Sequence, residues 1–194
     1  GVRINGGYGN LIGGSAIGSA NTISGNTLDG VRIENASGIP AETIGWWRAE
    51  NSATDAIGSN HGTLVGDTTY ADGNFGRAFS FDGSGDYVSV ANTAALNPTT
   101  TATWEAWINP ASIGSGFQAI LEKGAYSYEL SVTITGGLRL DVSGNGSTYE
   151  FAATADGVIT AGQWHHVAAT FDNGAIRLYV NGVQLHTATV STTS

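Results

Sequence analysis

Cysteine and methionine are both absent from the sequence, and only 12 % of its residues are charged. Without cysteine the chain has no disulfide framework, no thiol nucleophile and no thiolate metal site. Basic residues are also scarce, with 7 Lys and Arg against 16 Asp and Glu, which gives a formal net charge of −9. Because an acidic surface without a basic cluster repels nucleic acid and anionic membranes, we expect neither as a partner.

Targeting and membrane-spanning segments are absent from the sequence as well. No stretch is apolar enough over about 20 residues to insert into a bilayer, and no secretory signal opens the chain. The chain begins inside a repeat, so we expect a fragment of a longer, exported bacterial protein. A missing export signal then says nothing against an extracellular or cell-surface location.

The 194 residues allow one or two domains, and their composition favours an all-β fold. Glycine occurs 29 times, and Thr, Ser, Asn and Val are abundant. Short strands separated by frequent turns suit this composition. The best helical candidate is the short run Ala94-Ala95-Leu96, which Pro98 ends.

Residues 1–38 contain a sequence repeat and differ in their residue pattern from the rest of the chain. The motif Gly-Val-Arg-Ile at residues 1–4 returns at residues 30–33, 29 positions later, with two similar Asn- and Gly-bounded triplets in between. This pattern resembles the right-handed parallel β-helix of pectate lyase-like surface proteins, and further rungs are expected upstream because isolated rungs cannot bury a core. The alternative is a Gly/Ser/Asn-rich linker, but linkers do not repeat at a fixed spacing.

The alternation of residue types is clearest over residues 162–182. Its apolar residues alternate with polar ones on both sides of a turn at residues 172–174, and Asn181-Gly182 suits a tight hairpin. Three strands joined by two turns form a meander, and one apolar face must pack on a second sheet. Further strands are expected at residues 44–50, 76–81, 87–90, 101–108, 118–122, 126–133, 137–142 and 148–153.

This stretch also carries a family resemblance. Gln-Trp-His-His-Val-Ala-Ala-Thr-Phe-Asp at residues 163–172, followed by Arg-Leu-Tyr-Val-Asn-Gly at 177–182, resembles the signature of the laminin-G-like, concanavalin A-like jelly roll. Pieces at residues 79–83, 86–90, 104–108 and 120–124 match in the same order. The resemblance implies a two-sheet antiparallel sandwich over residues 44–194, after a linker at 39–43. The family's closing strand follows Thr189 and is incomplete here, so an edge is expected to be unpaired.

Catalytic constellations are missing from the sequence. Glycoside hydrolysis needs two carboxylates at a fixed separation, but Glu105, Glu122 and Glu129 stand singly among apolar neighbours. Adjacent His165 and His166 point to opposite faces of a strand, so they cannot chelate one metal, and we expect one of them to be buried and hydrogen-bonded. We therefore expect no enzyme activity from this chain.

Calcium is the metal that the resemblance implies, because laminin-G-like domains commonly bind Ca²⁺ through loop carboxylates and carbonyls. The candidate ligands are Asp82 and Asp86, which flank a Gly-Ser-Gly turn, and Asp55 in the early loop, with Asn60 nearby. Hard oxygen ligands on turns are what this ion requires. An EF-hand is excluded, since Tyr87 stands where its glycine is needed. The alternative is that these aspartates only form turns.

Aromatic residues are the candidate platform for carbohydrate, because the apolar face of a sugar stacks on a ring. The candidates are Trp46, Trp47, Trp107, Tyr126 and Tyr128. The competing interpretation is that these rings are covered by loops or by the core.

The sequence thus predicts a non-catalytic recognition or adhesion module for carbohydrate or another cell-surface ligand. One alternative is an accessory domain of a polysaccharide-degrading β-helix enzyme, whose catalytic groove would lie outside this chain. Another is a structural spacer in a large surface protein, which predicts no ligand and covered tryptophans.

Overall fold

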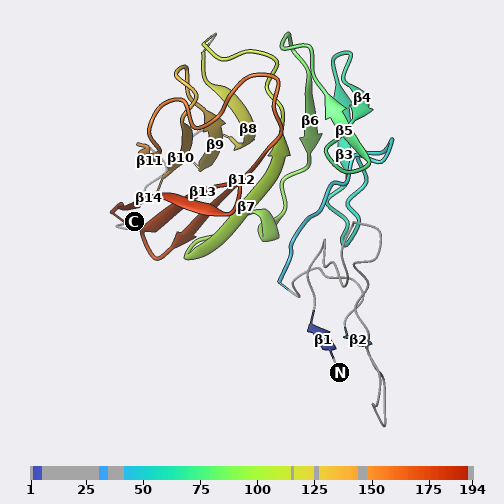
Figure 1. The fold of residues 1–194 in the computed structure, drawn as a ribbon, viewed down its shortest axis with the longest axis horizontal. Helices are drawn as coiled ribbons and strands as arrows, with labels where there is room; N and C mark the ends of the chain where they lie inside the picture. Colours follow the sequence, from blue (N-terminus) through green and yellow to red (C-terminus); the bar gives the residue numbers. More distant parts are fainter. Residues whose placement is uncertain are drawn as a thin grey trace, which may run out of the picture.

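In the computed structural model of the chain, the regular secondary structure consists almost entirely of β-strands (Figure 1). The structure describes residues 2–5, 31–34, 42–114, 116–124, 127–143 and 148–191, the first two ranges as backbone only. Two four-stranded antiparallel sheets pack face to face and form a jelly-roll sandwich, which confirms the predicted all-β fold class. Within the described residues, no helix is both long and apolar enough to cross a membrane.

The first sheet has the strand order β14-β13-β12-β7. It consists of β7 (Thr101–Ile108), β12 (His165–Asp172), β13 (Ala175–Val180) and β14 (Val183–Thr189). Asn173 and Asn181 adopt left-handed backbone with φ of 46° and 52°, each before a glycine that also has positive φ. These Asn-Gly pairs supply the tight turns of the meander, as the sequence predicted.

The second sheet has the strand order β11-β10-β9-β8. It consists of β8 (Gln118–Lys123), β9 (Tyr128–Val132), β10 (Leu138–Val142) and β11 (Glu150–Ala153). These strands lie where the alternation placed them, with ends moved by one or two residues. In β10, Leu138, Leu140 and Val142 are buried between the sheets, so the intervening Arg139 and Asp141 project from the outer face.

Apolar side chains from both sheets form one core. Leu130, Leu138 and Leu140 of the second sheet meet Ile176 and Leu178 of the first, and all five are fully buried. The alternating burial of β12 and β13 follows the period of two in their sequence. Burying these side chains supplies the main driving force for the sandwich.

Two short hairpin-like pairs lie beside the sandwich (Figure 1). β3 (Gly62–Val65) pairs with β6 (Tyr87–Val90), and β4 (Thr69–Asp72) pairs with β5 (Arg77–Ser80). The 3-10 turn η1 (Ala94–Leu96) precedes β7 at the position of the best helical candidate.

The two copies of the N-terminal repeat pair with each other. β1 (Val2–Asn5) and β2 (Val31–Glu34) run parallel, with Val2 opposite Val31 and Ile4 opposite Ile33. The offset in this register is the 29-residue spacing of the repeat. The two triplets between the copies, at residues 10–14 and 21–26, lie outside the described residues.

The prediction of a first jelly-roll strand at residues 44–50 is wrong. Only an isolated bridge joins Trp47 to Asp55 in this segment. The backbone N–H of Trp46 donates instead to the Asp55 carboxylate (3.0 Å), and Ala49 and Asn51 adopt positive φ. A segment whose donors serve a side chain and whose backbone turns left-handed cannot continue a strand ladder.

Candidate functional site

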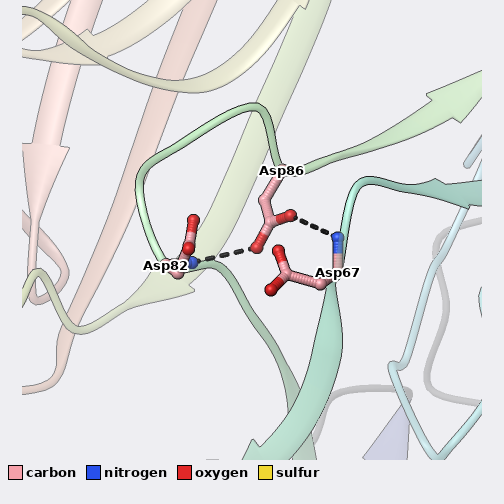
Figure 2. Close-up of side chains that lie close together, drawn as sticks. All are labelled: Asp67, Asp82 and Asp86. Atoms are coloured by element: carbon pink, nitrogen blue, oxygen red, sulfur yellow. Dashed lines mark hydrogen bonds between the residues drawn. The ribbon is translucent and has the colours of Figure 1, made fainter.

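Three aspartates gather where β3, β5 and β6 end or begin, and we call Asp67, Asp82 and Asp86 the acidic cluster (Figure 2). One carboxylate oxygen from each lies within 4.8 Å of the others. Asp82 and Asp86 are two of the predicted calcium ligands. Asp67 was missed, because it is far from them in sequence and is brought close only by the pairing of β3 with β6.

Asp86 holds the acidic cluster together through its carboxylate (Figure 2). Its Oδ1 accepts from the backbone N–H of Asp67 at 2.8 Å, and its Oδ2 accepts from that of Asp82 at 3.0 Å. The Asp82 Oδ1 in turn accepts from the N–H of Ser84 at 2.7 Å. The loop between β3 and β4 and the turn between β5 and β6 are thus already joined to each other through hydrogen bonds from backbone donors.

The acidic cluster carries negative charge that no cation offsets. The pKa of Asp67 is raised, first by sharing a hydrogen bond with the Asp86 carboxyl and then by repulsion from Asp86 and Asp82. The pKa of Asp86 is lowered, first by the backbone N–H of Asp82. Within the described part of the chain, no Lys, Arg or His forms an ion pair with these carboxylates. Such an oxygen-rich, negative site has the chemistry that a hard divalent cation needs.

Asp55, the third predicted ligand, does not belong to this cluster. Its carboxylate is buried and accepts from the backbone N–H groups of Trp46, Ile57 and Asn60. Burial acts to raise the pKa of Asp55, but these donors outweigh it, so the pKa is lowered. Asp55 therefore organises a loop, because its oxygens already serve the donors around it.

Trp107 stands on the outer face of the first sheet and is 44 % exposed. Phe75 lies edge-on to its ring at a centroid distance of 5.5 Å, and the His166 ring lies 5.3 Å away on the neighbouring strand. His166 Nε2 is 3.7 Å from Glu105 Oε2. We call Glu105, Trp107, His166 and Phe75 the Trp107 platform. The alternation of residue types along residues 101–108 identified Trp107 as a candidate. Phe75 comes from the loop between β4 and β5, and no pattern in the sequence indicated that it would contact Trp107.

Contrary to the prediction, the other aromatic candidates that the structure describes do not join this platform. Tyr128 packs between the sheets against Trp104, at a centroid distance of 4.8 Å, and its hydroxyl donates to the carbonyl of Leu96. Trp104 and Trp107 are three residues apart on β7, so they face opposite sides of the sheet. Tyr128 and Trp107 therefore cannot bind one ligand face, and burial raises the pKa of Tyr128.

Trp46 and Trp47 belong to the loop that Asp55 organises. The guanidinium of Arg48 lies 5.1 Å from the Trp46 ring, and Trp47 Nε1 donates to the carbonyl of Asn60 at 2.8 Å. Both side chains are half-buried, in keeping with rings partly covered by their own loop. Tyr126 lies outside the described residues.

The histidine pair behaves as the strand pattern predicted. His165 is buried, and its Nε2 accepts from the N–H of Thr160 at 3.1 Å, whereas His166 points to the outer face. The two rings cannot hold one metal together.

A family model of the concanavalin A-like lectin/glucanases superfamily matches residues 82–194. No curated protein matches the chain. Among solved structures, domain 4 of AbnA, an extracellular arabinanase of Geobacillus stearothermophilus in complex with arabinotriose, is 21 % identical with a TM-score of 0.57, over 72 % of this chain and 70 % of that one.

A second similar structure is that of botulinum neurotoxin type C, whose cell entry depends on two ganglioside molecules. It is 14 % identical with a TM-score of 0.59, and the match covers 77 % of this chain but only 39 % of the toxin chain. At sequence identities this low, the two structural matches show a shared fold.

Proposed function

The chain belongs to the concanavalin A-like lectin/glucanase superfamily, and on this premise we propose that it is a non-catalytic module that binds carbohydrate on the surface of a cell or outside it. The observation that carries the proposal is the Trp107 platform. An indole ring that is exposed on the outer face of a sheet and lies beside carboxylate and imidazole groups has the composition of a sugar-binding surface.

The Trp107 ring is already held in place before any ligand arrives. Phe75 contacts it from one side and His166 from another, so little side-chain entropy remains to be lost on binding. Polar groups that can bond sugar hydroxyls lie along the same face. Glu105 precedes Trp107 by two residues, and its cross-strand row also carries Tyr179 and Gln184, whose side chains are hydrogen-bonded at 3.2 Å. The bound arabinotriose of the arabinanase domain supports a glycan as the ligand class.

The test is a glycan array followed by titration of the best glycan into the wild-type chain and into Trp107→Ala. Removing the indole should weaken binding by about tenfold or more, because a stacked ring contributes roughly 1 kcal/mol or more beyond its area. Phe81→Ala is the matched control, since Phe81 is also exposed and aromatic, but its ring packs on Phe79 and it is not a member of the Trp107 platform. If Trp107→Ala binds as tightly as the wild type, the platform is not the site.

Calcium at the acidic cluster is a separate part of the proposal. The three carboxylates fit the ion because they are hard oxygen donors that converge from two loops, and no Lys, Arg or His of the described residues pairs with them. Asp67, Asp82 and Asp86 would hold it, and its charge would offset their mutual repulsion. Binding would lock the loops before β4 and β6 to each other.

A thermal melt with Ca²⁺ and with excess chelator tests the calcium proposal. A ligand of the native state raises the melting temperature in step with the logarithm of its concentration. Asp67→Asn should abolish this shift, while Asp55→Asn should keep it because Asp55 lies outside the cluster. An equal shift with Mg²⁺, or none with either ion, would count against a calcium site.

The larger context that we propose is a multidomain exported protein. Residues 1–38 would be the last rungs of a parallel β-helix, 39–43 a linker and 44–194 the jelly roll, and the parallel pairing of β1 with β2 supports the first assignment. Two alternatives remain, an accessory domain of a polysaccharide-degrading enzyme and a structural spacer. Activity of a longer form of the protein would identify the first, and a glycan array without hits would favour the second.

A further inference from the structure

The outer face of the second sheet carries a row of acidic residues that belongs neither to the Trp107 platform nor to the acidic cluster. Glu122 of β8 lies opposite Glu129 of β9, Glu129 lies opposite Asp141 of β10, and Asp141 lies opposite Phe151 of β11. The row therefore crosses all four strands on one face. Side chains directly opposite each other in an antiparallel pair have Cβ atoms about 4.5–5.5 Å apart, so these groups are neighbours.

Arg139 clamps two exposed rings onto this face. Its Nε and Nη2 each donate to the Asp141 carboxylate at 2.6 Å. Its guanidinium lies 3.6 Å from the centroid of Phe151 and 5.3 Å from that of Phe117, in the loop before β8. Phe117 and Phe151 nevertheless stay 56 % and 52 % exposed. The bidentate pair and the ring contacts fix the guanidinium, and the guanidinium fixes the rings.

Negative charge on this face exceeds positive charge. Arg139 neutralises Asp141, which leaves Glu122 and Glu129 without an ion-pair partner among the described residues. Burial raises the pKa of Glu129, and the charges of Asp141 and Glu122 raise it further. Lys123 alternates with Glu122 along β8, and its Nζ bonds Asn92 instead. With all groups ionised, three carboxylates face a single guanidinium.

We propose that this face, formed by Phe117, Glu122, Glu129, Arg139, Asp141 and Phe151, is a second binding surface that takes an oligosaccharide bearing ammonium groups, that is, an amino-sugar polymer without N-acetyl caps. The exposed Phe151 ring stacks on the apolar face of one sugar unit. The amino group of a neighbouring unit lies against Glu122 and Glu129 and supplies the missing positive charge. Acidic sugars are repelled by the same carboxylates.

This inference rests on the proposed function only in taking a glycan as the ligand. The two surfaces are on opposite sides of the sandwich, because Trp107 projects from the outer face of the first sheet and the core lies between the sheets. Variants of one surface therefore leave the other intact, and the failure of one proposal can be told from the failure of the other.

Isothermal titration with a glucosamine tetramer tests the inference, and an N-acetylglucosamine tetramer of equal length serves as the uncharged comparison. The wild type should bind the charged tetramer at least about tenfold more tightly than the acetylated one. Phe151→Ala should weaken that binding by about tenfold, and Glu129→Gln should weaken it severalfold and reduce its dependence on salt. Phe81→Ala is the control and should bind the charged tetramer as the wild type does, because Phe81 is exposed but belongs to neither proposed surface.

Several results would overturn the inference. Equal affinity for the two tetramers would remove the role of the ammonium groups, and unchanged affinity in both Phe151→Ala and Glu129→Gln would remove the surface. Tetralysine binding as tightly as the charged tetramer would show a surface that selects charge and not sugar. If Phe151→Ala does not fold, Glu122→Gln replaces it, because the Glu122 side chain is exposed and makes no ion pair with another described residue.

Discussion

At the scale of single residues, aspartates act as organisers of the loops around the sandwich. Asp55 and Asp86 each accept from backbone N–H groups that no strand partner serves. A buried or half-buried carboxylate of this kind replaces part of a missing ladder, because backbone donors removed from water need a partner. The two aspartates differ in their surroundings, because Asp86 has the carboxylates of Asp67 and Asp82 beside it and Asp55 is not a member of that cluster.

Replacing Asp55 by Ala should lower the free energy of unfolding by about 1–3 kcal/mol, because it leaves three backbone N–H groups without their acceptor. Denaturation in guanidinium chloride measures the change. Glu42→Gln is the control, since Glu42 is exposed. A loss of stability no larger than that of the control would contradict the organising role.

The Asp55 carboxylate should also make the stability of the protein depend on pH. The pKa of Asp55 is lowered on folding from its ordinary value of 3.8. Its stabilising contribution is therefore complete above pH values near 3.8 and is lost as the pH falls through the lower folded-state pKa. The wild type should lose stability over this acidic window more steeply than Asp55→Ala. If the unfolding free energies of the two proteins change with pH in the same way, the lowered pKa of Asp55 is not the cause.

Asp67 should have the opposite effect. Its pKa is raised on folding, so its ionised form is disfavoured in the native state at neutral pH. In chelator at pH 7, Asp67→Asn should therefore melt at or above the temperature of the wild type, while the wild type should overtake it when Ca²⁺ is added. A variant that melts lower in chelator would mean that Asp67 stabilises the loops without an ion.

At the scale of elements, the period of two along each strand decides which residues fill the core. Leu140 of β10 is fully buried, whereas Leu185 of β14, the edge strand, is 42 % exposed. Leu140→Ala should lower the free energy of unfolding by about 2–5 kcal/mol through lost burial and a new cavity. Leu185→Ala should cost less than about 1 kcal/mol. Similar losses for the two variants would contradict the assigned faces.

At the scale of the whole molecule, the core that the described residues form belongs to the jelly roll. All members of the buried cluster lie between Trp104 and Val190. Removing residues 1–38 should therefore shift the melting temperature of the sandwich by less than about 2 °C, given that 1 kcal/mol corresponds to roughly 2–4 °C in a chain of this size. Differential scanning calorimetry compares the two forms. A large drop would mean that the N-terminal repeat packs on the jelly roll.

The sequence by itself determined the strands and their faces. Alternation and the Asn-Gly turns located β12, β13 and β14, and the 29-residue repeat anticipated the register of β1 with β2. These features are local, because each depends on the period of a strand or on the conformation of two turn residues.

Only the tertiary structure decided which side chains meet. Asp67 joins Asp86 because β3 pairs with β6, so that Val65 lies opposite Tyr87. Arg139 reaches Phe151 because β10 and β11 share a register, and Phe75 reaches Trp107 because a loop folds against β7. The segment around Trp46 was wrongly predicted as a strand for the same reason, because its backbone N–H donates to the side chain of Asp55 and not to a neighbouring strand. Strand register and loop packing join residues far apart in sequence, and no local pattern records that choice.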